Sequence, residues 1–214
     1  MRVLFMVDLH WGGQRGLEWP DEQADLVLLG GDLTNFCGGA VAAKVIDAAA
    51  SRYGRVMAVC GNCDLPEAEA TLRQLDVDLD GRARDLEGVR FLGLSGGLPF
   101  GNCPYERSEN DYRDLAAELF AEDHPRPLIL VSHQPPHGVA CDLTRGRHVG
   151  STALRQAIQD HQPDLVLSGH IHEGIGTDQV GRTTVANPGP WMARRYLTFD
   201  VDSSGVKNLV LHHS

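Results

Sequence analysis

The amino-acid sequence predicts an α/β fold built in layers. Short, almost continuously apolar runs recur along the chain, and turn residues follow each of them. Such runs are typical of strands that are covered on both faces. Patterns typical of helices lie between the runs, and this alternation favours a domain whose sheet is largely parallel.

Each predicted element follows from its own residues. Six apolar runs predict buried strands, namely Val3–Val7, Leu26–Leu29, Val56–Val59, Val89–Leu94, Leu128–Val131 and Leu165–Leu167. Three later runs alternate more and predict antiparallel strands, namely Thr183–Ala186, Tyr196–Val201 and Val206–Leu211. Pro66 opens one predicted helix, and Ser151 can cap another. The four predicted helices are Ala40–Arg52, Pro66–Leu75, Ser108–Glu122 and Ser151–His161. The Gly- and Pro-rich segment Ser95–Arg107 precedes the third predicted helix. It is predicted to be a long loop that forms a rim of the substrate site.

Length and charge limit the classes of function. The 214 residues predict a single domain over residues 1–214. Asp and Glu number 29 against 19 Lys and Arg, a formal net charge of −10, which disfavours bulk nucleic-acid and membrane binding. Because the first apolar stretch ends at Asp8 and no run could span a bilayer, we expect a cytoplasmic protein. The 5 cysteines lack a regular spacing and are expected to be free thiols.

Polar side chains follow most of the predicted buried strands. In open α/β sheets, ligands bind at the carboxyl ends of the strands, so these side chains predict a site at that edge. The sequences that follow the strands are Asp8-Leu9-His10, Gly30-Gly31-Asp32, Gly61-Asn62-Cys63-Asp64, Ser132-His133 and Gly169-His170-Ile171-His172.

The spacing and chemistry of these residues indicate metal binding. Residues i and i+2 of an extended segment point to the same side, so Asp8 with His10, and His170 with His172, are each expected to face one space. The preceding glycines allow tight turns and close approach of the backbone. Imidazole nitrogens with carboxylate and amide oxygens suit Mn, Fe, Zn or Ni. The donors would serve two ions that share a carboxylate; they are Asp8, His10, Asp32, Asn62, His133, His170 and His172.

Together these motifs resemble those of the calcineurin-like metallophosphoesterases, and Asn187-Pro188-Gly189 extends the resemblance further along the chain. The resemblance implies a four-layer α/β/β/α sandwich and a dinuclear metal-dependent phosphoesterase. It implies two divalent ions per chain, Mn being favoured over Ni, Fe, Zn or Mg. It assigns Asp8, His10 and His172 to the first ion and makes Asp32 the bridge. The second ion takes Asn62, His133 and His170.

Two departures from the family pattern refine the expected activity. Where the family usually has His after Gly-Asn, this chain has Cys63 followed by Asp64, which is similar to a small bacterial and archaeal phosphodiesterase branch. A thiol is a weaker partner than imidazole for a departing alkoxide, so we expect a phosphodiesterase with Asn62, Cys63, Asp64 and His133 in catalytic roles. The Arg that Ser/Thr protein phosphatases carry shortly after the bridging Asp is absent after Asp32, which disfavours that class.

The expected reaction is in-line attack on phosphorus by a hydroxide that bridges the two metals. The expected partner is a small or nucleotide-like phosphoester. His137 follows His133 on a Pro-Pro turn and is a candidate substrate contact, or a proton donor in place of the missing His. Arg145-Gly146-Arg147-His148 could hold a second phosphate, although a solvated loop is the favoured interpretation. A homo-oligomer is compatible with the sequence, but no patch argues for one.

Three alternatives remain. The chain could be a phosphomonoesterase of the same fold. It could also be a non-catalytic metal-binding scaffold, as in a retromer subunit of that fold, although such scaffolds typically lose ligands. Cys60 and Cys63 form a C-x-x-C pattern that suggests a thioredoxin-like oxidoreductase. That interpretation explains none of the histidines and places Cys60 at the end of a buried strand, so we disfavour it.

Overall fold

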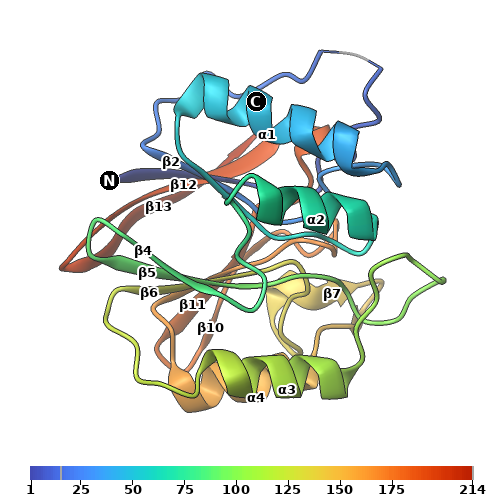
Figure 1. The fold of residues 1–214 in the computed structure, drawn as a ribbon. Helices are drawn as coiled ribbons and strands as arrows, with labels where there is room; N and C mark the ends of the chain where they lie inside the picture. The colour runs from blue at the N-terminus through green and yellow to red at the C-terminus, as the bar shows by residue number, and fades with distance from the viewer. Residues whose placement is uncertain (15, 214) are drawn as a thin grey trace.

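A computed structural model describes residues 1–14 and 16–213 as four stacked layers (Figure 1). Helices α1 (Gly39–Tyr53) and α2 (Pro66–Gln74) cover one face of a five-stranded sheet. Helices α3 (Glu109–Leu119) and α4 (Thr152–His161) cover the outer face of a six-stranded sheet. The two sheets pack against each other between these helix layers. The α/β/β/α sandwich expected from the sequence is confirmed.

The first sheet has the order β13-β12-β1-β2-β3. Its parallel strands are β1 (Arg2–Met6), β2 (Leu26–Leu29) and β3 (Val56–Ala58). The C-terminal hairpin of β12 (Arg195–Asp202) and β13 (Gly205–His213) adds antiparallel to β1. The chain therefore begins in the middle of this sheet and returns to it at its end.

The second sheet has the order β10-β11-β9-β6-β5-β4. Its four central strands are parallel: β5 (Val89–Leu94), β6 (Leu128–Ser132), β9 (Leu165–Leu167) and β11 (Thr183–Asn187). Antiparallel strands β4 (Ala83–Leu86) and β10 (Gly176–Val180) form its edges. A separate small hairpin consists of β7 (Leu143–Thr144) and β8 (Arg147–His148), and the short 3₁₀ helices are η1 (Ala140–Asp142) and η2 (Trp191–Ala193).

Three apolar layers hold this stack together. In β1, Val3 and Phe5 face the core between the sheets, whereas Leu4 and Met6 pack under α1 and α2. The third layer joins the second sheet to α3 and α4. Because successive strand residues point to opposite faces, a strand between two apolar layers must be apolar at every position. This explains why the central strands were recognisable in the sequence.

The predicted strands and helices are all present, with ends shifted by no more than three residues. The helix expected to reach Glu122 ends at Leu119, where the His124 imidazole contacts the Leu119 carbonyl oxygen at 2.7 Å. The expectation for Thr183–Ala186 is half right, since β11 pairs antiparallel with β10 but parallel with β9. The edge strands β4 and β10 were not predicted, because their alternating polar residues form no apolar run.

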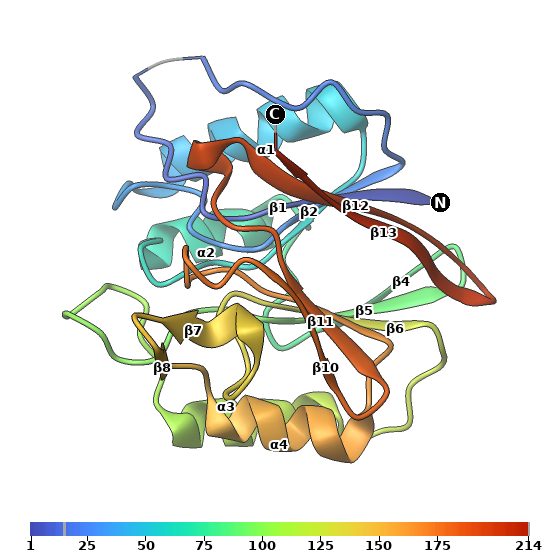
Figure 2. The ribbon, with the colours of Figure 1, turned by 180° about the vertical axis from the view of Figure 1, so that it is seen from behind.

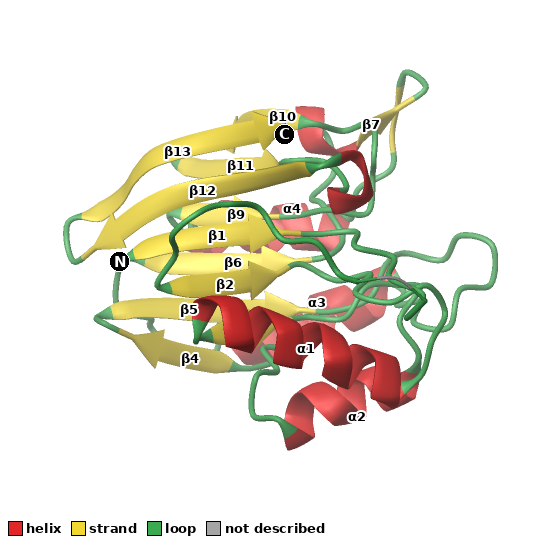
Figure 3. Cartoon of the chain, turned by 90° about the horizontal axis from the view of Figure 1, so that it is seen from above, coloured by secondary structure: helices red, strands yellow, loops and turns green. Residues whose placement is uncertain are grey.

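The parallel strands of both sheets end at the same edge of the molecule, as the arrows in Figure 3 show. Loops gather at that edge, and the β7–β8 hairpin projects from it (Figure 2). No helix within residues 1–14 and 16–213 is both long and apolar enough to cross a bilayer.

Candidate metal centre

The predicted ligand residues come from the carboxyl ends of five strands in the two sheets. Asp8, Asp32 and Asn62 follow β1, β2 and β3 of the first sheet, and His133 and His170 follow β6 and β9 of the second. The structure brings these loops together at the edge where the two sheets meet. Residues separated by up to 164 positions thereby share one site, which consists of Asp8, His10, Asp32, Asn62, His133, His170 and His172.

The ligand residues do not lie on extended segments. The expectation that Asp8 and His10 face one space because they are two positions apart on an extended segment is therefore wrong in its reason. Asp8, His10, Asp32 and His170 have φ angles of 54°, 46°, 48° and 64°, in the left-handed region. This conformation costs an L-residue about 1–2 kcal/mol. Asp8 and His10 therefore reach one space through tight turns rather than through the alternation of a strand. Such strain is found where surrounding structure holds a functional group in place.

Two glycines let these loops pack closely. A Cβ at Gly31, where φ is 101°, would lie 2.6 Å from Nδ1 of His133. A Cβ at Gly61 would lie 2.1 Å from Oδ1 of Asp32. Both distances are far below van der Waals contact, so any side chain would displace a ligand residue. The expected role of the glycines before Asp32 and Asn62 agrees with this geometry.

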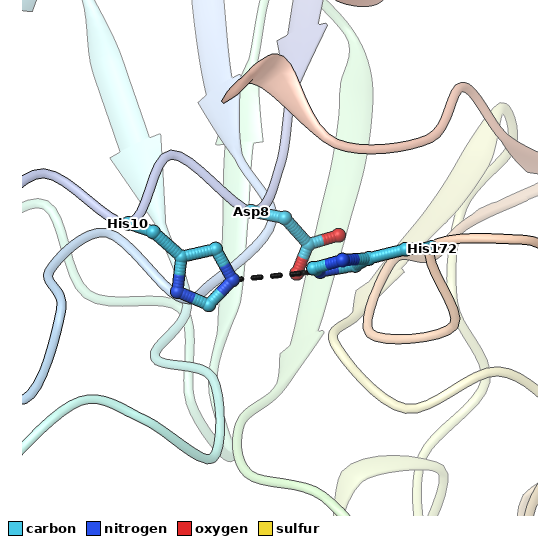
Figure 4. A group of neighbouring side chains, drawn as sticks. All are labelled: Asp8, His10 and His172. Carbon is cyan, nitrogen blue, oxygen red and sulfur yellow. Dashed lines mark hydrogen bonds and ion pairs between the residues drawn. The ribbon is translucent and has the colours of Figure 1, made fainter. Parts of the chain in front are cut away.

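The first group of ligands is Asp8, His10 and His172, whose donor atoms lie within 4.8 Å of one another (Figure 4). Nε2 of His10 is 3.4 Å from Nε2 of His172, and Nε2 of His172 is 3.6 Å from Oδ1 of Asp8. That Asp8 oxygen is buried and has no hydrogen-bond partner among the described residues. A buried carboxylate oxygen without a partner is costly, and a cation at this point would compensate it. These residues therefore fit a divalent metal ion.

Asp32 lies between the two groups of imidazoles. Its Oδ2 is 3.5 Å from Nε2 of His10, and its Oδ1 is 3.6 Å from Nε2 of His133. The main-chain N–H of Cys63 donates to Oδ1 at 2.8 Å, which fixes the carboxylate in this orientation. Although burial favours the neutral acid, the charge of His133 lowers the pKa of Asp32 far below its usual value. Asp32 thus presents one carboxylate oxygen to each side of the site.

The second group is Asn62, His133 and His170. Nδ1 of His133 is 2.9 Å from the carbonyl oxygen of Gly30, and Nε2 is 3.0 Å from Oδ1 of Asn62. If Nδ1 donates its proton to Gly30, Nε2 and Oδ1 are two lone-pair donors that face each other. A hydrogen bond from the distal ring nitrogen is the usual support for a metal-binding histidine. The ring of His170 lies beside that of His133, with centroids 5.2 Å apart.

Neighbouring charges shift the pKa values of His133 and His170 in opposite directions when no metal is bound. Burial alone would lower the pKa of His133, but the Asp32 carboxylate raises it to about 9. Burial, together with the neighbouring His133, lowers the pKa of His170 to about 4. One imidazole therefore carries a proton that balances the carboxylates while its neighbour stays neutral. Divalent ions would take over this role, because metal-bound imidazole must be neutral.

Cys63 lies beside the ligands, whereas Asp64 points into the protein. The Sγ of Cys63 is within 4.8 Å of donor atoms of His10 and Asp32, and burial raises the pKa of this thiol. The fully buried Asp64 carboxylate accepts hydrogen bonds from the main-chain N–H groups of Leu33, Thr34 and Gly61, and from the Thr34 hydroxyl. It therefore joins the loops of Asp32 and Asn62 from within the protein, and the catalytic role expected for it stays a prediction.

His137 lies outside the ligand groups. Its ring centroid is 5.6 Å from that of His148 on β8, and its main-chain N–H donates to the Ser151 carbonyl at 2.9 Å.

The C-x-x-C interpretation finds no support in the structure, because Cys60 is fully buried and burial raises the pKa of its thiol well above the usual value.

Supporting residues around the site were not identified from the sequence. Asn187 donates through Nδ2 to the carbonyl oxygens of Gly169 and Ile171, at 3.4 and 3.0 Å, and so holds the His170 loop. Arg107 forms two hydrogen bonds to the buried Asp80 carboxylate, at 2.8 and 2.6 Å. This pair ties down the predicted rim loop, whose Gly97 lies against Asn62 and His170. Asn187 belongs to the Asn187-Pro188-Gly189 motif, but the sequence does not show which carbonyl groups it contacts. The pairing of Asp80 with Arg107 has no signal in the neighbouring sequence.

Comparisons with known proteins agree with this geometry. A family model described as calcineurin-like phosphoesterase matches residues 1–174. An uncharacterized protein of Methanocaldococcus jannaschii is 30% identical over 99% of this chain and 95% of its own length. The crystal structure of a dimetal phosphatase from Danio rerio has a TM-score of 0.61 at 14% identity, covering 99% of this chain and 98% of that one.

A phosphopantetheinyl hydrolase from Mycobacterium tuberculosis also has a TM-score of 0.61, at 16% identity, with coverage of 90% of this chain and 92% of its own. At these identities the two solved structures show a common fold. The family match covers most of the chain and includes every predicted ligand residue. The chain therefore belongs to the calcineurin-like phosphoesterase family, which implies metal-dependent hydrolysis of a phosphoester.

Proposed function

We propose that this protein is a dinuclear metal-dependent phosphodiesterase. The observation that carries the proposal is the position of Asp32, whose two carboxylate oxygens face His10 on one side and His133 on the other. A carboxylate shared in this way is the element that a two-metal site requires. The similar fold of a protein called a dimetal phosphatase supports the two-metal part of this proposal.

Each group of residues would hold one divalent ion. Asp8, His10 and His172 would bind the first, and Asn62, His133 and His170 the second, with Asp32 between them. When bound, such ions supply Lewis-acid charge for a phosphoryl oxygen and lower the pKa of water toward neutrality. Mn is the metal that we favour, because the donors combine imidazole nitrogen with hard oxygen atoms.

The residue at position 63 favours a diester as substrate. The Sγ of Cys63 lies beside His10 and Asp32, and Cys63 stands at the position after Gly61-Asn62 where the family that this sequence resembles usually has His. Because a buried thiol with a raised pKa is a poor acid, it gives little help to an unactivated alkoxide leaving group. His137 lies four residues from His133, and we retain it as a proposed substrate contact rather than a ligand.

The test compares two chromogenic esters that share a leaving group. Metal-stripped protein is refilled with Mn, Ni, Zn or Mg and assayed with bis(p-nitrophenyl) phosphate and with p-nitrophenyl phosphate. We expect metal-dependent hydrolysis with kcat/KM higher for the diester. A higher value for the monoester would indicate a phosphomonoesterase. Two bound ions per chain without turnover of either ester would identify a non-catalytic scaffold.

A further inference from the structure

Cys63 is a buried cysteine that apolar packing does not explain. Cys60 lies in the apolar layer under α1 and α2, and Cys141 lies in the layer next to α3 and α4. Cys63 is only 8% exposed, yet over residues 1–14 and 16–213 it belongs to none of the three apolar layers. A free cysteine in a protein interior usually acts as a small apolar side chain. The position of Cys63 therefore needs a polar explanation.

The neighbours of Cys63 are groups that bind metal. Its Sγ, a ring nitrogen of His10 and a carboxylate oxygen of Asp32 all lie within 4.8 Å of one another. The main-chain N–H of Cys63 donates to Oδ1 of Asp32 at 2.8 Å. Nδ2 of Asn62 donates to Sγ of Cys63 at 3.5 Å. These contacts fix both the main chain and the thiol of Cys63 beside the first group of ligands.

The spacing of the donors around His10 fits a metal ion. Zn lies about 2.0–2.3 Å from its ligands, so the ligands of a tetrahedral Zn site lie about 3.3–3.8 Å from one another. Nε2 of His10 is 3.4 Å from Nε2 of His172 (Figure 4) and 3.5 Å from Oδ2 of Asp32. Because Sγ of Cys63 is within 4.8 Å of His10 and Asp32, a shift of about 1 Å or less brings it to the same spacing. The thiol is thus within reach of an ion held by these residues.

Sulfur distinguishes Zn from Mn. Thiolate suits Zn, whereas carboxylate, carbonyl and water oxygens suit Mn. Burial raises the pKa of the free Cys63 thiol, but a thiol that coordinates a divalent ion is deprotonated outright. A sulfur atom bound to the first ion also takes a position that water or substrate would otherwise fill. The thiol therefore allows two states of the centre, one for each class of metal.

We propose that Cys63 is a ligand of the first metal position for Zn, but not for Mn, and that it sets the metal preference of the centre. Mn would bind there through nitrogen and oxygen donors alone and keep positions open for substrate. When Zn binds, the S–H bond of Cys63 breaks, a metal–sulfur bond forms and the proton passes to water. The inference deepens the proposed function, because it rests on the same metal centre, but it does not depend on hydrolysis of a diester.

Cobalt(II) tests the sulfur ligand directly, because it replaces Zn and its absorption spectrum reveals its ligands. Metal-stripped protein is titrated with Co(II), and the near-ultraviolet spectrum is followed for the charge-transfer band from thiolate to cobalt. We expect this band in the wild-type protein and its loss when Zn displaces the cobalt. Cys63→Ser and Cys63→Ala should lack the band. Cys103→Ser, whose thiol lies on the segment Ser95–Arg107, is the matched control and should keep it.

Metal affinity provides the second measurement. Dissociation constants for Zn and for Mn are measured separately, by competition with a chromogenic chelator. In Cys63→Ser, the preference for Zn over Mn should fall at least about tenfold, because a hydroxyl is a harder donor than a thiolate. The affinity for Mn should change little.

Two results would overturn the proposal. One is cobalt bound to the wild-type protein without the charge-transfer band, or with a band that persists in Cys63→Ser. The other is an unchanged preference for Zn in that variant. A band in the cobalt protein without diester hydrolysis by the Mn-loaded protein would support the sulfur ligand and contradict the phosphodiesterase function. Metal-dependent hydrolysis without a band would do the reverse.

Discussion

His10 and His172 are 162 positions apart in the sequence, yet their Nε2 atoms face each other at 3.4 Å with ring planes at 70° (Figure 4). Two ring nitrogens in this arrangement can share a proton or a metal ion. The Asp8 oxygen that has no hydrogen-bond partner lies beside them. These three metal-donor atoms are directed at one point and contribute little stabilising energy through contacts with one another. Without metal the site is therefore poorly satisfied, and metal binding and stability should be linked.

The first prediction concerns Asp8. In Asp8→Asn, a buried oxygen without a partner loses its charge, so we expect the metal-free variant to be at least as stable as the wild type. The rise in Tm on adding Mn should fall by more than half, because a metal ligand is lost. Asp142→Asn is the matched control. Its buried carboxylate is fully hydrogen-bonded, so we expect a loss of about 2–4 kcal/mol in the free energy of unfolding. A metal-free Asp8→Asn protein with a clearly lower Tm would contradict this account.

The second prediction concerns Asp32. Asp32→Asn removes the charged group that faces both sets of ligands, and we expect metal content to fall from two ions to at most one per chain. Hydrolysis of the diester should fall by at least about 100-fold. Metal content is measured by inductively coupled plasma mass spectrometry after dialysis. Retention of two ions and full activity would rule out the bridging role.

The third prediction concerns Cys63. Cys63→His places an imidazole beside His10 and Asp32, where it can act as a general acid. We expect the ratio of monoesterase to diesterase kcat/KM to rise about tenfold or more. Cys63→Ser, which adds no acid with a pKa near neutrality, should leave that ratio near the wild-type value. An unchanged ratio in the His variant would show that residue 63 does not control protonation of the leaving group.

The fourth prediction concerns Asp64, whose oxygens accept four hydrogen bonds inside the protein. Asp64→Asn converts one acceptor into a donor and leaves buried N–H groups without a partner. We expect a loss of about 2–4 kcal/mol in the free energy of unfolding, because bonds to a charged acceptor are strong. Mn affinity should fall as well, since the loops of Asp32 and Asn62 lose their common support. A variant with normal stability but no turnover would instead indicate a direct chemical role.

The fifth prediction is a pH dependence of stability. Although burial favours the neutral acid, the hydrogen bonds from Arg107 lower the pKa of Asp80. A lowered pKa stabilises the folded protein above the unfolded value of about 3.9, and this stability is lost as the pH falls through the folded value. Asp80→Asn should therefore cost about 3 kcal/mol at pH 7 and clearly less at pH 3. Urea unfolding at both pH values measures the difference, and an equal cost at both would contradict the ion-pair explanation.

The sequence was informative wherever a local pattern has one dominant physical cause. A strand between two apolar layers must be apolar throughout, so β2, β5 and β9 were predicted with the bounds that the structure shows. The edge strands β4 and β10 were missed, because one face and one edge of each are open to solvent and their polar residues resemble a loop. The donor types at the strand ends were also visible in the sequence, because metals require particular atoms.

Tertiary structure decided how these donors are arranged. Asp8 and His10 converge through left-handed turns, which no i, i+2 rule describes, and His172 joins them only because β9 ends beside β1 across the two sheets. The burial of Asp64, the pairing of Asp80 with Arg107 and the position of the β7–β8 hairpin likewise depend on distant segments. The sequence by itself determined the layers and the metal-binding chemistry, since both follow from local composition. Distances, charges and orientations needed the folded chain, because they arise from contacts between residues far apart in the sequence.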